Sequence, residues 1–123
     1  ARLMLGPGSG QILLVVAALE DQTTRLASDI ARCLRSDPVW AWPGAEAQGG
    51  EISEVVREHL FTHVVLFGDE LAASMFDGPV PATLGSARLV SVPSIQGLAS
   101  LPAERRTLWQ LISSNGLARH ANN

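Results

Sequence analysis

Two pairs of acidic residues are the groups in this 123-residue sequence whose spacing most suggests chemistry. Glu20-Asp21 follows one apolar run, and Asp69-Glu70 follows another. If both runs are parallel strands, their carboxyl ends share one edge of a sheet, which would bring Glu20, Asp21 and Asp69 together. Carboxylates grouped in this way hold Mg²⁺ in phospho-receiver domains. A receiver site also uses a lysine, and the sequence contains none, so we expect both pairs to act as favourable charges at helix N-termini. A receiver-like or small-ligand α/β domain remains the alternative.

The other reactive side chains form no catalytic or metal-binding pattern. His59 and His63 are four residues apart, but they straddle the junction of a predicted helix and a predicted strand, and no Cys or acidic residue has a complementary spacing. The single cysteine, Cys33, lies in an amphipathic helix, where we expect it to pack near the core. The glycines of residues 6–10 precede a strand, whereas a phosphate-binding loop follows one. The sequence therefore predicts no catalytic residue, no metal ion and no cofactor.

Strand and helix patterns alternate along the chain. Apolar runs predict strands over residues 2–5, 11–17, 39–42, 62–67 and 87–92. Apolar residues at helical spacing predict helices over residues 21–34, 51–60, 70–76 and 103–111. This alternation predicts an α/β fold with three layers, α/β/α, around a mostly parallel sheet of about four strands. The apolar runs on either side of the Gly/Pro cluster at 6–10 also suggest an N-terminal hairpin strand.

Length and composition indicate one globular domain. At 123 residues and 46% apolar residues, the chain can form one core, and we expect a single domain over 1–123. Within it, residues 1–10 are expected to form an edge strand and a Gly/Pro turn, and residues 113–123 a frayed tail. The longest apolar run, 12–19, is too short to span a membrane and lacks the features of a secretory signal. We therefore expect a soluble, cytoplasmic protein with no membrane partner.

Two tryptophans are the candidates for contact with a protein partner. Trp40 and Trp42 are two residues apart in a predicted strand, so they face the same side of the sheet. They are either core residues or, where exposed, anchors for a partner, because tryptophan dominates interface hot spots. No basic residues surround them, and the net charge of -3 includes no basic stripe. We therefore expect no strong direct binding to nucleic acid.

Two segments resemble the psi subunit of bacterial DNA polymerase III. Residues 26–34, LASDIARCL, followed by SDP at 36–38, look like the first long helix of that family. Residues 92–112, with VPS at 92–94 and LWQLI at 108–112, are similar to its final loop and helix. The Leu-Trp-Gln block of 108–110 is the most specific part of the resemblance.

The resemblance implies a non-catalytic adaptor of the replicase. Psi subunits are α/β/α proteins that bind the chi subunit and link it to the clamp loader, and chi in turn binds single-stranded-DNA-binding protein. The family contacts the clamp loader through an N-terminal peptide, and this sequence begins almost at its first predicted strand, so we expect that tail to be absent here. No chi-contact residue follows from the motifs, which leaves Trp40 and Trp42 as candidates. A protein-interaction module outside replication would share such a surface but not these partners.

Overall fold

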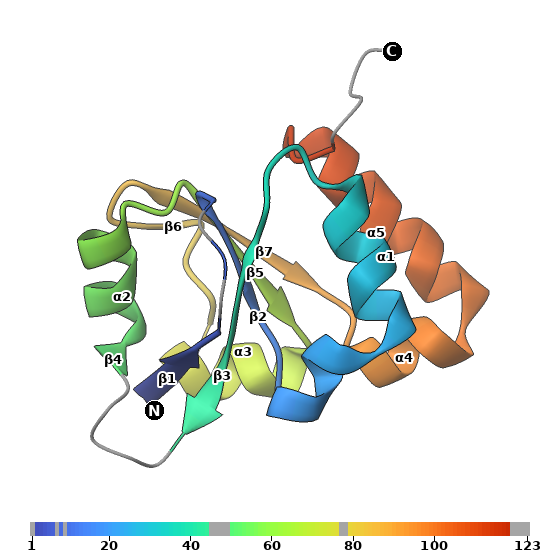
Figure 1. The fold of residues 1–123 in the computed structure, drawn as a ribbon, viewed down its shortest axis with the longest axis horizontal. Coiled ribbons are helices and arrows are strands. Elements are labelled where there is room, and N and C mark those ends of the chain that lie inside the picture. The colour runs from blue at the N-terminus through green and yellow to red at the C-terminus, as the bar shows by residue number, and fades with distance from the viewer. Residues whose placement is uncertain (1, 7, 9, 45–49, 77–78, 119–123) are drawn as a thin grey trace.

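The computed structural model of the chain describes residues 2–6, 8, 10–44, 50–76 and 79–118, which form a mixed α/β fold (Figure 1). Its seven-stranded sheet has the order β4-β1-β3-β2-β5-β7-β6. The strands are β1 (Arg2–Leu5), β2 (Ile12–Val15), β3 (Val39–Gly44), β4 (Gly50–Glu51), β5 (His63–Phe67), β6 (Thr83–Leu84) and β7 (Ala87–Val92). The helices are η1 (Leu19–Thr23, a 3₁₀ helix), α1 (Arg25–Cys33), α2 (Ile52–His59), α3 (Asp69–Phe76), α4 (Ile95–Ser100) and α5 (Pro102–Ser114). Within the ranges described, no helix is long and apolar enough to cross a membrane.

Four parallel strands form the centre of the sheet. β2 pairs in parallel with β3 on one side and with β5 on the other, and β5 pairs in parallel with β7. Every residue of β2 is buried, as a continuous apolar run predicts for a strand covered on both faces. The predicted α/β fold with a mostly parallel sheet is thus confirmed. The sheet contains more strands than expected, because β4 and β6 are only two residues long and leave no apolar run in the sequence.

Helices cover both faces of the sheet and enclose two hydrophobic clusters. α2 and α3 lie on one face, and α1, α4 and α5 lie on the other (Figure 1). Successive residues of β2 point to opposite faces. Leu13 and Val15 therefore join the cluster beneath α2 and α3, which we call the α2-side core, whereas Ile12 and Leu14 join the cluster beneath α1, α4 and α5, the α1-side core.

The predicted N-terminal hairpin is wrong. β1 pairs antiparallel with β3 rather than with β2, so β3 lies between the two strands that the hairpin would have joined. The connection from β1 to β2 consequently crosses the start of β3, and its glycines make this crossing sterically feasible. A Cβ on Gly10 would lie 2.0 Å from the carbonyl oxygen of Asp37, and a Cβ on Gly8 would lie 2.4 Å from that of Pro38. β1 is also not an edge strand, because β4 pairs with its outer side.

The predicted helix over 21–34 is two helices. Thr24 adopts an extended conformation, which ends η1, and its Oγ1 accepts a hydrogen bond from the Ala27 amide at 3.1 Å, which caps α1. α4 was not predicted. It is six residues long and has Gly97 near its middle. Ser94 caps its N-terminus, because the Ser94 Oγ accepts a hydrogen bond from the Gly97 amide at 3.1 Å.

The expected fraying from residue 113 onward is wrong over 113–118. α5 continues to Ser114, and Gly116, at φ 72°, then turns the chain back toward α1. Leu117 is fully buried in the α1-side core, and its carbonyl accepts a hydrogen bond from the Arg35 amide at 2.8 Å. The burial of Leu117 orders this segment. Residues 119–123 lie outside the described residues.

Candidate functional site: an apolar face over β1 and β3

The acidic strand ends meet at one edge of the sheet but do not form a metal site. β2 and β5 are parallel neighbours, so Asp21 and Asp69 follow strands that end at the same edge, as predicted. Asp21 is only 7% exposed, and its Oδ1 accepts a hydrogen bond from Gln96 Nε2 of α4 at 3.2 Å. This carboxylate therefore joins η1 to α4, whereas Glu20 and Asp69 are exposed. Among the described residues, no three His, Cys, Asp or Glu side chains could hold a metal ion together.

Asp69 also lines a shallow pocket at this edge, together with two further carboxylates. The pocket has a volume of about 280 Å³ and is lined by Gly68, Asp69, Glu70, Pro93, Ser94 and Glu104. Asp69 and Glu70 are in the first turn of α3, and Glu104 is in the first turn of α5. This confirms the expectation that the acidic pair at 69–70 sits at a helix N-terminus, where it offsets the positive end of the helix dipole.

His59, His63 and Cys33 lie on three different elements of the described fold. His59 ends α2 and stacks on Phe61, with ring centroids 5.7 Å apart. His63 lies on β5, and its Nδ1 is 3.0 Å from the Thr62 hydroxyl. Burial lowers the pKa of His63, and the positive charges of Arg35 and Arg88 lower it further. The expectation that Cys33 packs near the core is wrong: it is exposed, because it lies beside the buried stripe of α1.

The two tryptophans share a face, as predicted, but differ in exposure. Trp40 is 9% exposed and belongs to the α1-side core, where its ring centroid lies 6.2 Å from that of Phe67. It is thus a core residue with little surface left for a partner. Trp42 packs against the same core but is only half-buried. Of the two candidates, Trp42 alone keeps substantial apolar surface.

Met4 extends the exposed surface of Trp42 across the neighbouring strand. The two residues are directly paired in the antiparallel β1–β3 ladder, so their side chains lie on the same face. Leu3 points into the α2-side core, which places Met4 on the α1 side, where it too is half-buried. We call this pair the Met4–Trp42 face. Met4 has no signal of this role in the sequence, because its pairing depends on the insertion of β3 beside β1.

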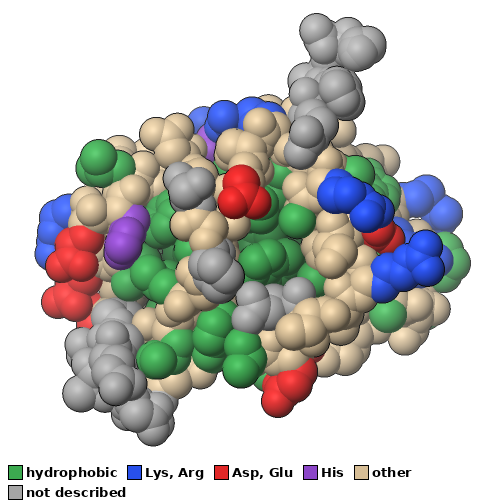
Figure 2. Space-filling model, viewed as in Figure 1, with side chains coloured by type: hydrophobic (Ala, Val, Ile, Leu, Met, Phe, Trp, Pro, Cys, Tyr) green, Lys and Arg blue, Asp and Glu red, His purple; other side chains and the backbone are tan. Residues whose placement is uncertain are grey.

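The Met4–Trp42 face lies at the end of the sheet that the helices leave open. α1, α4 and α5 stand over the side of the sheet that β2, β5 and β7 form, while β1 and β3 extend beyond them (Figure 1). Figure 2 shows hydrophobic side chains gathered between the two helical layers, over β1 and β3. Large aromatic and thioether side chains on a rigid strand provide adaptable apolar contact area for another protein.

This geometry offers an apolar contact surface on β1 and β3. Comparisons with protein-family models, curated proteins and solved structures find no match to this chain.

Proposed function

We propose that this chain is a non-catalytic adaptor of the bacterial replicase, resembling the psi subunit, that binds the chi subunit. Through chi it would connect single-stranded-DNA-binding protein to the clamp loader during DNA replication in the cytoplasm. The observation that carries the proposal is the Met4–Trp42 face, an apolar surface on the sheet that includes a half-buried tryptophan. A replicase adaptor needs such a surface and needs no catalytic group.

The segments that carry the resemblance have a structural role that suits this proposal. Leu108 and Ile112 are buried in the α1-side core, and Trp109 between them is half-buried against it. In α1, Ala27 and Ile30 enter the same core. Both segments thus belong to the layer of helices that lies beside the Met4–Trp42 face, and both pack on the α1-side core. We infer that they support the contact surface and that Trp42 makes the contact.

The test is co-elution of this chain with the chi subunit of the same organism, by size-exclusion chromatography with light scattering. The proposal predicts a complex with one copy of each chain that survives moderate salt, because an apolar interface is little affected by screening. Separate elution at micromolar concentrations would contradict it. A partner from outside replication on the same face would then indicate a general interaction module.

A further inference from the structure

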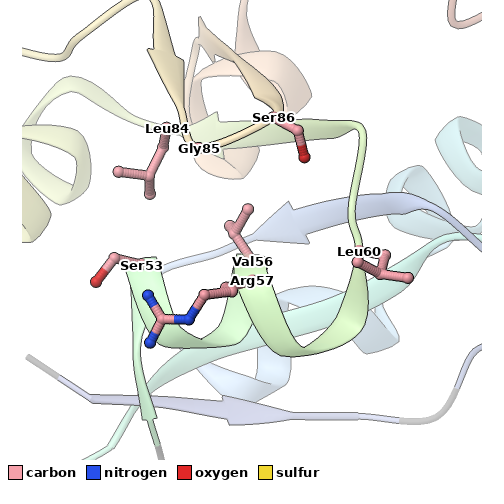
Figure 3. Close-up of a pocket in the computed structure, with 7 residues that line it drawn as sticks. All are labelled: Ser53, Val56, Arg57, Leu60, Leu84, Gly85 and Ser86. Atoms are coloured by element: carbon pink, nitrogen blue, oxygen red, sulfur yellow. The ribbon is translucent and has the colours of Figure 1, made fainter.

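A second surface, on the opposite helical layer, has the chemistry of a peptide-binding pocket. It lies between α2 and the turn that joins β6 to β7 and has a volume of about 210 Å³. Its lining residues are Ser53, Val56, Arg57, Leu60, Leu84, Gly85 and Ser86. In Figure 3, the side chains of Leu84, at the end of β6, and Val56, on α2, extend into the space between the two elements, and Leu60 lies at the C-terminal end of α2. The walls are therefore apolar, and the rim carries polar groups.

Among the described residues that line the pocket, Arg57 is the only one with a charge. Across the part of the chain that the structure describes, no hydrogen bond or ion pair engages its guanidinium group. Glu54, one turn earlier on α2, directs its carboxylate to the backbone amide of Glu51 in a capping box. A free guanidinium group beside an apolar pocket favours a ligand with a carboxylate next to an apolar group.

Leu60 has an unusual conformation for a residue at this position. Its φ of 58° and ψ of 39° are left-handed, a conformation that a side chain with a Cβ disfavours. This conformation reverses the direction of the chain and allows Phe61, which is 2% exposed, to enter the α2-side core. Glycine would permit the same chain reversal without strain. Leu60 is also 69% exposed, so neither backbone conformation nor burial explains a leucine here. A partner that covers Leu60 would explain it.

The size of the pocket limits the class of ligand. Sites for cofactors and drug-sized molecules usually have volumes of about 300–1,000 Å³. This pocket is smaller and is suited to one apolar side chain, with room at its rim for a neighbouring acidic residue. We therefore propose that it binds a leucine or similar residue flanked by acidic residues, in an extended segment of a partner protein. The inference goes beyond the adaptor function and does not depend on chi binding.

The proposal is tested with a fluorescein-labelled peptide, Ser-Glu-Leu-Glu-Gly-Ser, capped at both ends, by fluorescence anisotropy and by amide chemical shifts. We expect saturable binding that shifts the amides of Ser53, Leu60 and Gly85. Replacing Glu by Gln in the peptide, or Arg57→Gln in the protein, should weaken binding at least about fivefold, as loss of a hydrogen bond between charged groups does. Arg106→Gln, a matched change of an exposed arginine on α5, should leave affinity unchanged.

Leu60→Gly separates binding from folding because its two expected effects have opposite signs. Glycine removes the left-handed strain, so the melting temperature should stay the same or rise. Removing the leucine side chain should weaken peptide binding about tenfold. The proposal would be overturned if Arg57→Gln bound the peptide as tightly as the wild type does. It would also be overturned if the peptide shifted only amides outside α2 and the β6–β7 turn. Binding of N-acetyl-leucine without binding of the peptide would assign the pocket to a small metabolite and overturn it as well.

Discussion

The glycine-containing connection between β1 and β2 yields a sharp prediction about the fold. At Gly10 an added Cβ would lie 2.0 Å from the Asp37 carbonyl oxygen, whereas ordinary contacts begin near 3.4 Å. The opposing atom belongs to the backbone, so no side-chain rotation relieves the overlap. We expect Gly10→Ala to push the connection away from β3 and to weaken the hydrogen bond from the Gly6 amide to the Trp40 carbonyl, which is 2.7 Å long.

The expected cost of Gly10→Ala is about 3 kcal/mol in the free energy of unfolding, the upper part of the range for overpacking a close contact. Gly85→Ala is the matched control. Gly85 has a φ of 60° but no atom within 4 Å of its added Cβ, so alanine there should cost only about 1 kcal/mol, from backbone strain alone. The comparison therefore isolates the steric contact with β3.

Urea unfolding followed by tryptophan fluorescence measures both effects. The free energy of unfolding of a small domain falls by about 1.5 kcal/mol per M of urea. The urea midpoint should therefore fall by about 2 M for Gly10→Ala and by less than about 1 M for Gly85→Ala. A midpoint for Gly10→Ala equal to or above that of Gly85→Ala would refute the placement of β3 between β1 and β2. It would instead favour a hairpin in which Gly10 meets no neighbouring strand.

Three further predictions concern titration, a hydrogen bond between side chains and a helix cap. Because the pKa of folded His63 lies below its ordinary value of 6.5, the unfolded chain binds protons more readily, and stability is lost as pH falls below that value. Arg88→Gln should raise the pKa of His63 in an NMR titration and lessen this loss; an unchanged pKa would contradict the electrostatic cause. Asp21→Ala should destabilise the fold by about 1–2 kcal/mol, and a double-mutant cycle with Gln96→Ala should show coupling; additive effects would count against the hydrogen bond. Thr24→Ala should cost about 1 kcal/mol in thermal unfolding, through loss of the α1 cap, and an unchanged melting temperature would exclude that role.

The central architecture could be predicted from the sequence because its signals are local. The continuous apolar run at 12–15 and the helical repeat over 51–60 each fix one element without reference to any other. Strand order is different, since it depends on which distant segments pair. The Gly/Pro cluster at 6–10 is compatible with a hairpin and with a crossing over β3, and the pairing of β1 with β3 rather than β2 decides between the two.

The candidate surface was only half predictable for the same reason. The two-residue spacing of Trp40 and Trp42 placed both on one face, but their exposure depends on where the helices end over the sheet. Trp40 lies within the helical layer and Trp42 at its margin. Met4 became a candidate only through its pairing with Trp42, and Leu60 only through its backbone conformation. Neither property has a signal in the sequence.

The most direct test of the account is calorimetric titration of the chi subunit into the wild-type chain and into two variants. Trp42→Ala removes the proposed anchor, and Leu101→Ala removes a leucine that is 54% exposed at the junction of α4 and α5. We predict that wild type and Leu101→Ala bind alike, and that Trp42→Ala, shown to be folded by its melting curve, binds at least about 30-fold more weakly, as hot-spot tryptophans do. Absence of binding by the wild type, or equal binding by Trp42→Ala, would contradict the account.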